Sequence, residues 1–460
     1  MKYPVSMTHP LLTPENFARY ARANVPRYTS YPTAPAFSAA VGECQYRQWL
    51  AAIAPGTEIS LYLHVPFCRS MCLYCGCHTT VSARDEPIER YMNALDREID
   101  LVTAAMPGGL AVRHLHFGGG SPTLVHPARM ITLMERLRRE FAFASGAEVA
   151  IEVDPRTLSG EMAAALGASE FNRASIGVQC FDPVVQRAIN RIQSVEETEA
   201  AVRSLREAGV EGINVDLIYG LPHQTVASCL DTVDQALRME PGRFAVFGYA
   251  HVPQFKQHQR RIDAAALPDF AERLAQSHAV AEALTAAGYV EIGLDHFARA
   301  DDPLAIAFKA NTMHRNFQGY TTDAAEVLIG LGSSAIGRTP SGYAQNTVLI
   351  SDYLSRVNEG RLPTARGYAL TAEDKVRGAV IERIMCDRKV DLAAVCGPHG
   401  WDPEALVDRN RLGELIGDGL VEERGSVLEV TAPALPLVRS VAAAFDAYLD
   451  DNAGRYSRAV

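Results

Sequence analysis

The chain has 460 residues, of which 48% are hydrophobic and 21% charged, a composition typical of a globular protein with a large core. Its net charge is −10, which disfavours a broad surface for nucleic acid or an anionic membrane, because either partner would be repelled. It has no apolar run long enough to span a membrane and no apolar signal-peptide core near its start, so we expect a cytoplasmic protein.

Residues 1–55 precede the first predicted strand and contain the segment PRYTSYPTA at residues 26–34. Two tyrosines, one arginine and two prolines within this segment indicate an ordered loop. We interpret residues 1–55 as an N-terminal arm. It either packs on the body of the protein as a strap or contacts a substrate.

Between residues 56 and 365, short β-branched runs alternate with longer amphipathic stretches. The predicted strands are 59–65, 112–117, 148–153, 174–178, 213–219 and 244–250, with a later run at 289–294. The predicted helices are 88–105, 128–141, 196–208, 226–239 and 271–286. This alternation is typical of βα units around a parallel sheet. We therefore predict an α/β fold, a full or partial TIM-like barrel over residues 56–365.

After residue 365 the alternation stops. Residues 372–386, 402–418 and 436–449 have helical patterns, and residues 419–430 read as a hairpin. Helices followed by a hairpin resemble a winged helix, a module that often binds DNA. Residues 367–460 hold 11 Lys+Arg against 16 Asp+Glu, a net of −5, which disfavours DNA. We interpret residues 366–460 as a mainly helical, winged-helix-like domain that acts as a lid or packing element.

Four of the nine cysteines fall within ten residues, in the segment Cys68-Arg-Ser-Met-Cys72-Leu-Tyr-Cys75-Gly-Cys77 after the first predicted strand. Three thiolates at C-x3-C-x2-C spacing suit three corners of a 4Fe–4S cluster and leave one iron open to a ligand. The match favours Cys68, Cys72 and Cys75 as ligands and leaves the role of Cys77 open. A structural zinc site usually draws its ligands from two separated segments, and a redox CxxC pair needs only two cysteines.

Polar or glycine residues also follow the other predicted strands, where parallel barrels place their chemistry. Gly118–Gly120 follow the second strand, and Glu152, Gln179, Asp216 and His251 lie at the ends of the third to sixth. The glycines would let the backbone approach a ligand closely, such as the amino-acid end of S-adenosylmethionine. The carboxylates would accept hydrogen bonds from its ribose or ammonium group, or cap the following helices. Arg191 is a candidate for a ligand carboxylate.

Taken together these motifs resemble the oxygen-independent coproporphyrinogen III oxidases (dehydrogenases) of haem biosynthesis, a radical S-adenosylmethionine family. The resemblance covers nearly the whole chain. Its segments are PRYTSYPTA (26–34), LYLHVPFCRSMCLYCGC (61–77), LHFGGGSPT (115–123), IEVDPRTL (151–158), FNRASIGVQCFDP (171–183), NVDLIYGLPHQT (214–225), GYAHVP (248–253), DHFAR (295–299), HRNFQGYTT (314–322) and YAQN (343–346). The family's threonine is replaced by Ser121, which keeps the hydroxyl.

The resemblance implies an α/β fold with a partial (β/α)6 TIM-like barrel over residues 56–365. It also implies a 4Fe–4S cluster on Cys68, Cys72 and Cys75 and two S-adenosylmethionine molecules. The residues that match the first S-adenosylmethionine site are Tyr62, Gly119, Glu152 and Ile336. Those that match the second site are Tyr74, Gly120, Ser121, Gln179, Arg191, Asp216 and Ala250. Arg27 in the arm is our candidate for contact with substrate carboxylates.

The implied reaction is the oxidative decarboxylation of two propionates of coproporphyrinogen III to vinyl groups by 5′-deoxyadenosyl radical chemistry, giving protoporphyrinogen IX. The resemblance further implies a monomeric enzyme that receives electrons from a reductase or from a flavodoxin or ferredoxin. One rival is a haem chaperone on the same scaffold, although such relatives carry an aromatic residue in place of Cys77 and an HNxxYW motif, and here the tryptophans are only Trp49 and Trp401. Another rival is a porphyrin-related radical S-adenosylmethionine enzyme that transfers methyl groups or opens the haem ring.

Overall fold

The computed structural model describes residues 11–449, 456, 458 and 459, which form two compact units. We call Ser38–Tyr289 together with Ala325–Ala369 the barrel unit. The terminal unit contains the chain up to Phe37, Val290–Ala324 and the chain from Leu370 onward. The units therefore do not follow chain order, and the linear division at residues 55 and 365 stays a prediction about domain boundaries. No helix in the described ranges is both long and apolar enough to cross a membrane.

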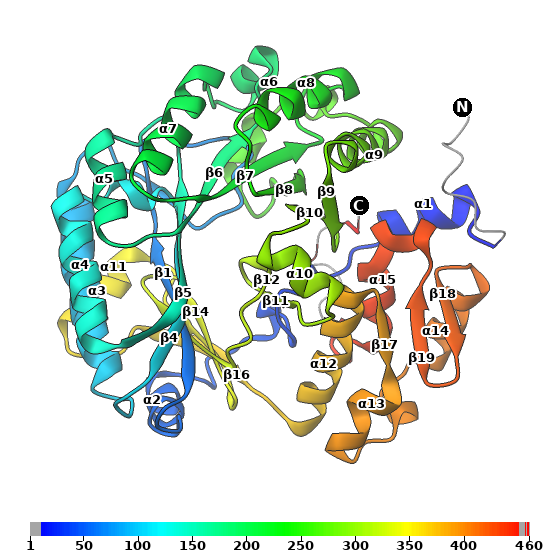
Figure 1. Ribbon diagram of the computed structural model, residues 1–460. Helices are drawn as coiled ribbons and strands as arrows, with labels where there is room; N and C mark the ends of the chain where they lie inside the picture. The colour runs from blue at the N-terminus through cyan, green and yellow to red at the C-terminus, as the bar shows by residue number, and fades with distance from the viewer. Residues whose placement is uncertain (1–10, 450–455, 457, 460) are drawn as a thin grey trace. The chain divides into compact units, whose positions relative to one another are not determined.

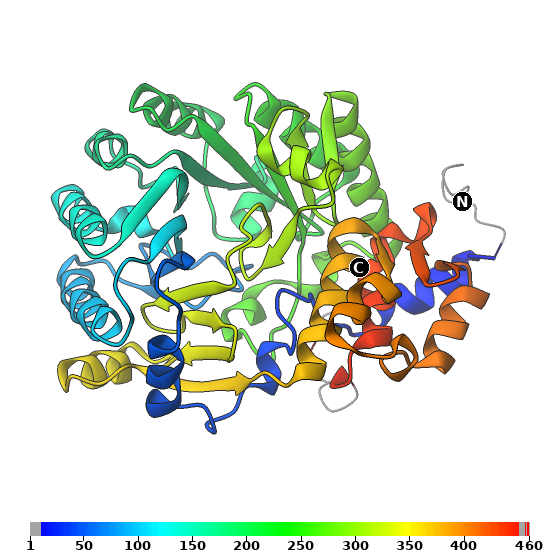
Figure 2. The same cartoon turned by 60° about the horizontal axis from the view of Figure 1, so that its bottom comes forward.

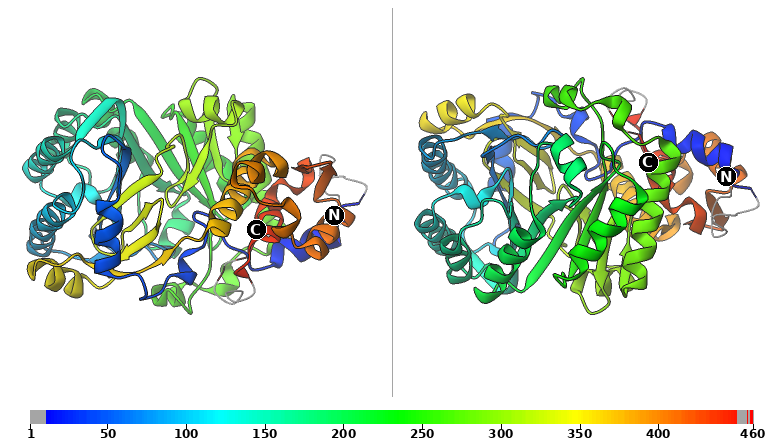
Figure 3. Two further views of the ribbon diagram at one scale, coloured as in Figure 1. Left: turned by 90° about the horizontal axis from the view of Figure 1, so that it is seen from below. Right: turned by 90° about the horizontal axis from the view of Figure 1, so that it is seen from above.

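Six neighbouring parallel strands form the main part of the barrel unit, as the sequence predicted. They are β1 (Glu58–Val65), β4 (Ala111–Gly119), β5 (Ala142–Val153), β6 (Arg173–Gln179), β7 (Gly212–Tyr219) and β8 (Arg243–Gly248), adjacent in this order. The intervening helices are α3 (Glu86–Thr103), α4 (Pro127–Glu140), α5 (Gly160–Ala168), α6 (Pro183–Ala188), α7 (Val195–Glu207) and α8 (Val226–Leu237), followed by α9 (Phe270–Ala286). These helices lie outside the curved sheet (Figures 1 and 3). The partial (β/α)6 barrel is confirmed.

The sheet continues beyond β1 in a way that the sequence did not reveal. Strand β13 (Val327–Leu331) pairs in parallel with β1, and β14 (Ile336–Thr339), β15 (Gly342–Asn346) and β16 (Thr364–Ala369) follow as an antiparallel meander. Figure 2 shows this meander in yellow, with α2 (Glu43–Ala51) in blue and α11 (Ile350–Asn358) in the same unit. These strands are short and rich in glycine, so they carry little of the β-branched pattern that marks a strand.

The two faces of the parallel sheet differ in polarity, and this difference places the site. On β1, Ile59, Leu61 and Leu63 are fully buried, while Tyr62 between them is half-buried on the other face. The register sets Tyr62 opposite His116 and Glu152 opposite Ser175. Because residues paired across a parallel ladder point the same way, polar side chains collect on one face of the sheet near the ends of its strands.

The terminal unit is mainly helical with small sheets. Its elements are α1 (Pro14–Arg22), β10 (His296–Arg299), α10 (Pro303–Lys309), β11 (His314–Asn316), β12 (Gly319–Thr321), α12 (Ala372–Asp387), β17 (Lys389–Asp391), α13 (Leu392–Cys396), α14 (Arg409–Gly417), β18 (Val421–Arg424), β19 (Val427–Val430) and α15 (Val438–Ala442). The predicted hairpin forms β18 and β19, which join β17 in a three-stranded sheet as in a winged helix. Ile292, Leu304, Met313 and Tyr320 form one buried cluster.

Three predicted elements of the later chain are shorter than expected. The helix expected over 402–418 begins only at Arg409, because the Asp408 side chain accepts from the Asn410 and Arg411 amides and caps a new helix there. The helix expected over 436–449 is reduced to α15 between two 3-10 turns, with Pro436 inside the first. The run 289–294 forms β9 (Tyr289–Ile292), next to β10 in the sheet rather than a seventh barrel strand.

Candidate functional site

The cysteine loop leaves the carboxyl end of β1 and is pinned at several places. Phe67 and Cys68 form β2, which pairs with β3 (Thr80–Val81). The Leu73 amide donates to the Ile189 carbonyl oxygen at 2.8 Å, and Asn190 Nδ2 donates to the Met71 carbonyl oxygen at 2.8 Å. The loop is thus tied to the segment after β6. Cys72 is buried, and Cys68 and Cys75 are half-buried.

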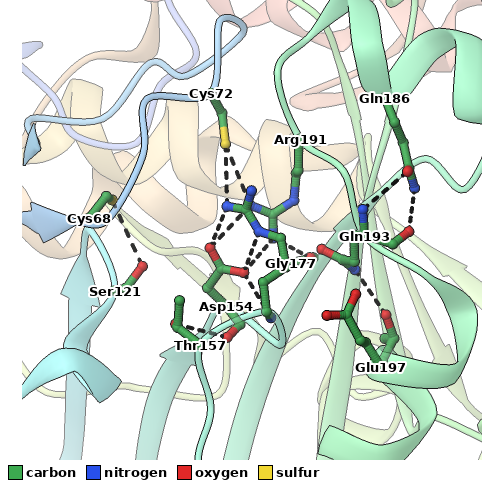
Figure 4. Close-up of polar contacts among 12 residues, drawn as sticks. Cys68, Cys72, Ser121, Asp154, Thr157, Gly177, Gln186, Arg191, Gln193 and Glu197 are labelled. Atoms are coloured by element: carbon green, nitrogen blue, oxygen red, sulfur yellow. Dashed lines mark hydrogen bonds and ion pairs between the residues drawn. The ribbon is translucent and has the colours of Figure 1, made fainter. Parts of the chain in front are cut away.

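Two guanidinium groups lie against the sulfur of Cys72 (Figure 4). Arg156 Nη2 and Arg191 Nη1 each lie 3.6 Å from Cys72 Sγ. Asp154 holds both arginines, with Arg156 Nη2 at 2.6 Å and Arg191 Nη2 at 3.3 Å from its carboxylate oxygens. Arg191 Nη2 also donates to the Gly177 carbonyl oxygen at 2.6 Å. Two N–H groups are thus aimed at the sulfur of Cys72.

The other two thiols of the motif have weaker donors around them. Thr79 Oγ1 lies 3.1 Å from Cys68 Sγ, and Ser121 Oγ donates to the same sulfur at 3.8 Å. Burial raises the pKa of Cys68. A hydrogen bond from the Cys77 side chain lowers the pKa of Cys75 to about 7, against the effect of burial. Cys77 is thus a neighbour that favours the Cys75 thiolate.

The glycines at the carboxyl end of β4 lie where no side chain fits. Gly119 has φ +113°, and a Cβ there would lie 2.6 Å from the His64 ring. A Cβ on Gly120 would lie 2.4 Å from the Phe67 carbonyl oxygen, a backbone atom next to the first cysteine. The absence of side chains brings this backbone directly beside the cysteine loop, as expected for a close approach to a ligand.

Glu152 and Tyr62 lie on the polar face beside these glycines. Glu152 Oε2 accepts from the Gly119 amide at 3.0 Å, and 39% of its side chain is exposed, so the carboxylate has free capacity for a ligand. The Tyr62 ring stacks on His116 with centroids 6.0 Å apart. His64 Nε2 donates to the His78 carbonyl oxygen at 2.9 Å, and its Nδ1 accepts from the Tyr62 hydroxyl at 2.9 Å. The predicted residues at β1, β4 and β5 are therefore assembled.

The predicted residues at the later strands lie on the same rim. Gln179 has φ +69° at the end of β6 and is buried. Asp216 on β7 accepts from Ser175 Oγ at 2.9 Å and from Asn214 Nδ2 at 2.7 Å. The carbonyl oxygens of Tyr74 and Ala250 accept from one amide nitrogen, Gln259 Nε2, at 3.1 and 3.3 Å. Ile336 is the first residue of β14.

These residues suit an iron–sulfur cluster with a ligand beside it. A loop with three thiols, N–H and O–H donors at Cys72 and Cys68, and a glycine backbone at its side form a donor set of the kind that holds such a cluster. All the predicted site residues except Arg27 belong to the barrel unit. Arg27 lies in the terminal unit with its side chain exposed.

Sequence reasoning missed several residues of this site. Arg156 was not singled out, although it stands two residues after Asp154, a spacing that lets the two side chains pair. Glu98 was also missed: it is buried within α3 and accepts from the Gly332 amide at 2.7 Å, at the turn that leads to Ile336. No signal in the sequence marks Glu98, because its position in the helix does not reveal its distant partners.

Comparison with known proteins explains this arrangement. The radical SAM superfamily model matches residues 62–236, and the HemN C-terminal domain model matches residues 370–437. An oxygen-independent coproporphyrinogen III oxidase of Bradyrhizobium diazoefficiens is 55% identical over 96% of this chain and 98% of that relative. The chain belongs to the oxygen-independent coproporphyrinogen III oxidase family.

More distant members of the family agree over nearly the same length. The Escherichia coli relative of that name is 40% identical over 93% of this chain and 94% of the relative. The solved structure of coproporphyrinogen III oxidase from Escherichia coli, described as a radical SAM enzyme, superposes with a TM-score of 0.88 at 39% identity. It covers 93% of this chain and 100% of that structure. The family and its fold, inferred above from motifs, are confirmed.

Proposed function

We propose that this protein converts coproporphyrinogen III to protoporphyrinogen IX without oxygen, by oxidative decarboxylation of two propionate side chains to vinyl groups. One observation carries the proposal. A loop with three thiols, with two guanidinium groups on Cys72, lies beside a glycine backbone at the rim of a barrel that matches the oxidase family over nearly its whole length.

Cys68, Cys72 and Cys75 would hold the 4Fe–4S cluster. When bound, the cluster and S-adenosylmethionine supply a low-potential electron and the means to abstract a hydrogen from the propionate. Asp154 keeps Arg156 and Arg191 aimed at Cys72, where their N–H groups stabilise negative charge on the sulfur. Because donors to a ligand sulfur affect cluster potential, this trio sets how easily the site accepts an electron.

Two groups of residues would hold S-adenosylmethionine. Tyr62, Gly119, Glu152 and Ile336 would bind the first molecule, with the half-exposed Glu152 carboxylate accepting from its ammonium or ribose donors. The second molecule would contact Tyr74, Gly120, Ser121, Gln179, Arg191, Asp216 and Ala250. In this structure Arg191 is already engaged by Asp154 and the Gly177 carbonyl oxygen, so it would orient the site as well as attract a carboxylate.

Three arginines of the terminal unit, Arg27, Arg315 and Arg439, lie near one another and form a local positive cluster that suits a substrate with four carboxylates. Arg315 Nε and Nη2 donate to the Arg27 carbonyl oxygen at 3.3 Å, and Arg315 Nη1 is buried without a partner. Burial, with Arg27 and Arg315 nearby, lowers the pKa of Arg439 to about 9. The charge partner shared by these three arginines is Asp295, whose pKa His296, Arg315 and Arg27 lower to about 2 against the effect of burial. We propose Arg27 and Arg315 as substrate contacts on this basis.

The test is product identification under anaerobic conditions. Reconstituted protein is incubated with coproporphyrinogen III, S-adenosylmethionine and dithionite, and porphyrins and nucleosides are analysed by liquid chromatography and mass spectrometry. We expect protoporphyrinogen IX, carbon dioxide and 5′-deoxyadenosine. Tight haem binding without turnover would indicate a chaperone, and methylated or ring-opened porphyrin would indicate a different reaction; either result would overturn the proposal.

We also propose that the enzyme works as a monomer in the cytoplasm and receives its electrons from a carrier protein. The resemblance over the whole chain supports this proposal. Light scattering during size-exclusion chromatography tests the oligomeric state, and a mass of twice 50.0 kDa would contradict it.

A further inference from the structure

A short basic segment donates hydrogen bonds to the cysteine loop. Residues 254–261, here called the basic segment, read QFKQHQRR and follow β8. Lys256 Nζ donates to the Cys77 carbonyl oxygen at 3.0 Å, and His258 Nε2 donates to the Cys75 carbonyl oxygen at 2.8 Å. Gln259 Nε2 donates to the Tyr74 carbonyl oxygen at 3.1 Å. Three side chains of one segment thus contact three residues of the loop that would carry the cluster.

The anchor of this segment is rigid. Gln259 is 1% exposed, and its Oε1 accepts from the Val252 amide at 2.6 Å while its Nε2 reaches Tyr74. The 3-10 helix η4 (Gln257–Arg261) then ends the segment. A buried amide with both ends satisfied holds the surrounding backbone in one place, so the charges on either side of Gln259 have fixed positions relative to the loop.

The side of the segment that faces solvent carries unpaired positive charge. Arg260 and Arg261 are exposed, and neither makes an ion pair with any residue that the structure describes. The segment contains three Lys+Arg and no acidic residue, in a chain whose net charge is −10. The nearest acidic residue along the chain, Asp263, accepts from the Ala265 amide as a helix cap. This part of the surface would attract an anion that the rest of the chain would repel.

An aromatic side chain stands beside these charges. Phe255 is 59% exposed, one of the few large apolar side chains on the described surface. Aromatic and arginine side chains are enriched where proteins bind one another. The combination favours a macromolecular partner over a small anion, because a small anion would leave the ring in water.

We infer that the basic segment is the docking surface for the electron donor, an acidic carrier protein of the flavodoxin or ferredoxin class. The inference rests on the proposed function, since only a reductively activated enzyme needs a donor. The reduced carrier loses one electron and the cluster site gains it, with no bond made or broken. Electron transfer falls steeply with distance. A donor seated on Phe255, Arg260 and Arg261 would lie against the segment whose other side chains contact the Tyr74, Cys75 and Cys77 carbonyl groups.

The experiment measures donor binding and turnover separately in the reconstituted enzyme. The variant is Arg260→Glu with Arg261→Glu. The matched control is Arg203→Glu with Arg238→Glu, which makes the same change in charge at an exposed arginine on α7 and an exposed arginine directly after α8. Binding of an acidic flavodoxin is measured by isothermal titration calorimetry at low and high salt. Turnover is then driven either by reduced flavodoxin or by dithionite, which needs no docking surface.

We expect the Arg260/Arg261 variant to bind flavodoxin about tenfold or more weakly at low salt, with little difference at high salt. Flavodoxin-driven turnover should fall to a similar extent, while dithionite-driven turnover stays unchanged. The control variant should match the wild type in all three measurements. Phe255→Ala should weaken binding a few-fold at either salt concentration, because its contribution is apolar.

Three results would overturn the inference. Equal losses with both reductants and a raised KM for coproporphyrinogen III would make the segment a substrate site. Equal weakening by the control would mean that only net charge matters. Unchanged flavodoxin binding in the glutamate variant, or in Arg260→Gln with Arg261→Gln if the first does not fold, would rule out docking there. If wild-type enzyme makes no product with dithionite, the proposed function fails, and the calorimetry still decides where flavodoxin binds.

Discussion

The barrel unit contains two carboxylates with very different surroundings, Asp154 at the cysteine loop and Glu98 beneath the turn after β13. Asp154 is held by Arg156 and Arg191, and despite its burial these arginines lower its pKa. Glu98 is 1% exposed and contacts no cation among the described residues. Burial raises the pKa of Glu98 to about 7, although three donors oppose the shift. Three neutral donors therefore do not offset the effect of burial on the pKa of Glu98, whereas two guanidinium groups do so for Asp154.

Asp154 and Glu98 also position the residues of the site in two different ways. Asp154 works through charge, by holding two arginines on a cluster ligand. Glu98 works through geometry, by accepting from the Gly332 amide at 2.7 Å, Asn346 Nδ2 at 2.6 Å and the Tyr353 hydroxyl at 2.7 Å. These contacts hold the turn that leads to Ile336. Substitutions in the two networks should therefore affect stability and turnover in different ways.

The largest effect is expected for Arg191→Ala. The change leaves Asp154 with one cation instead of two and removes a donor from both Cys72 and Gly177. Breaking a buried ion pair typically costs about 3–5 kcal/mol, so we expect a marked fall in the thermal midpoint. Turnover should fall by about 10- to 100-fold, the range typical of losing a group that supports a metal ligand. Thermal melting, iron and sulfide content and turnover measure the effect.

Two further variants sharpen that result. Arg187→Ala, in the same segment but exposed, should leave the midpoint and turnover unchanged. Arg191→Lys keeps the charge but loses the planar fork, and should fall between the wild type and alanine. If Arg191→Ala binds iron, melts and turns over like the wild type, the Arg191 guanidinium has no role in the site.

The next effect is a dependence of stability on pH that Glu98→Gln should remove. Between about pH 4.5, the usual value, and about pH 7, the folded protein keeps a proton on Glu98 that the unfolded chain has released. Stability therefore falls as pH rises through this window, by about 3 kcal/mol for this one group. Glutamine stays neutral at every pH, so the variant should keep the stability that the wild type loses. Thermal midpoints from pH 5 to pH 8 measure the difference.

Asp154 should show the opposite sign. Its lowered pKa contributes stability at neutral pH that is lost only in acid, as pH falls below the usual range for an aspartate.

The control for Glu98→Gln is Glu207→Gln, at an exposed glutamate on α7, and it should not change the slope of stability against pH. A wild type and a Glu98→Gln variant with parallel midpoints from pH 5 to pH 8 would contradict the protonated Glu98.

The parts of the fold and of the site that could be predicted from the sequence are those that depend on residues close together in the chain. The thiol loop, Gly118–Gly120 and Glu152 are local features at strand ends, and once the βα alternation was recognised they had to share one rim. The sequence does not indicate that Arg156 belongs to the site, because an arginine after a strand is usually a surface residue. Its aim at Cys72 depends on Asp154, which the sequence indicates only as a neighbour.

Features made by distant segments could not be predicted. Glu98 contacts Gly332, Asn346 and Tyr353 only because β13 pairs with β1. The short, glycine-rich strands in this part of the chain have no sequence pattern that predicts the pairing. The helix expected over 402–418 failed for a local reason, since Asp408 caps a new start within an apolar pattern that looked continuous. Periodicity shows which face is buried but not where hydrogen bonds stop and restart.

The smallest effect is expected at an exposed ion-pair network in the terminal unit, and it tests whether burial is what separates Asp154 from Glu98. Arg409 donates to Glu404 and, at 2.8 Å, to Glu423, with 44% of its own side chain exposed. Water solvates all three groups when the pairs break, so Arg409→Ala should cost less than about 1 kcal/mol, and less again in 0.5 M salt. A loss above about 2 kcal/mol, measured by melting at both salt concentrations, would show that pairing stabilises this fold even at the surface. The opposite pKa shifts of Asp154 and Glu98 would then reflect the number of their partners rather than the removal of those partners from water.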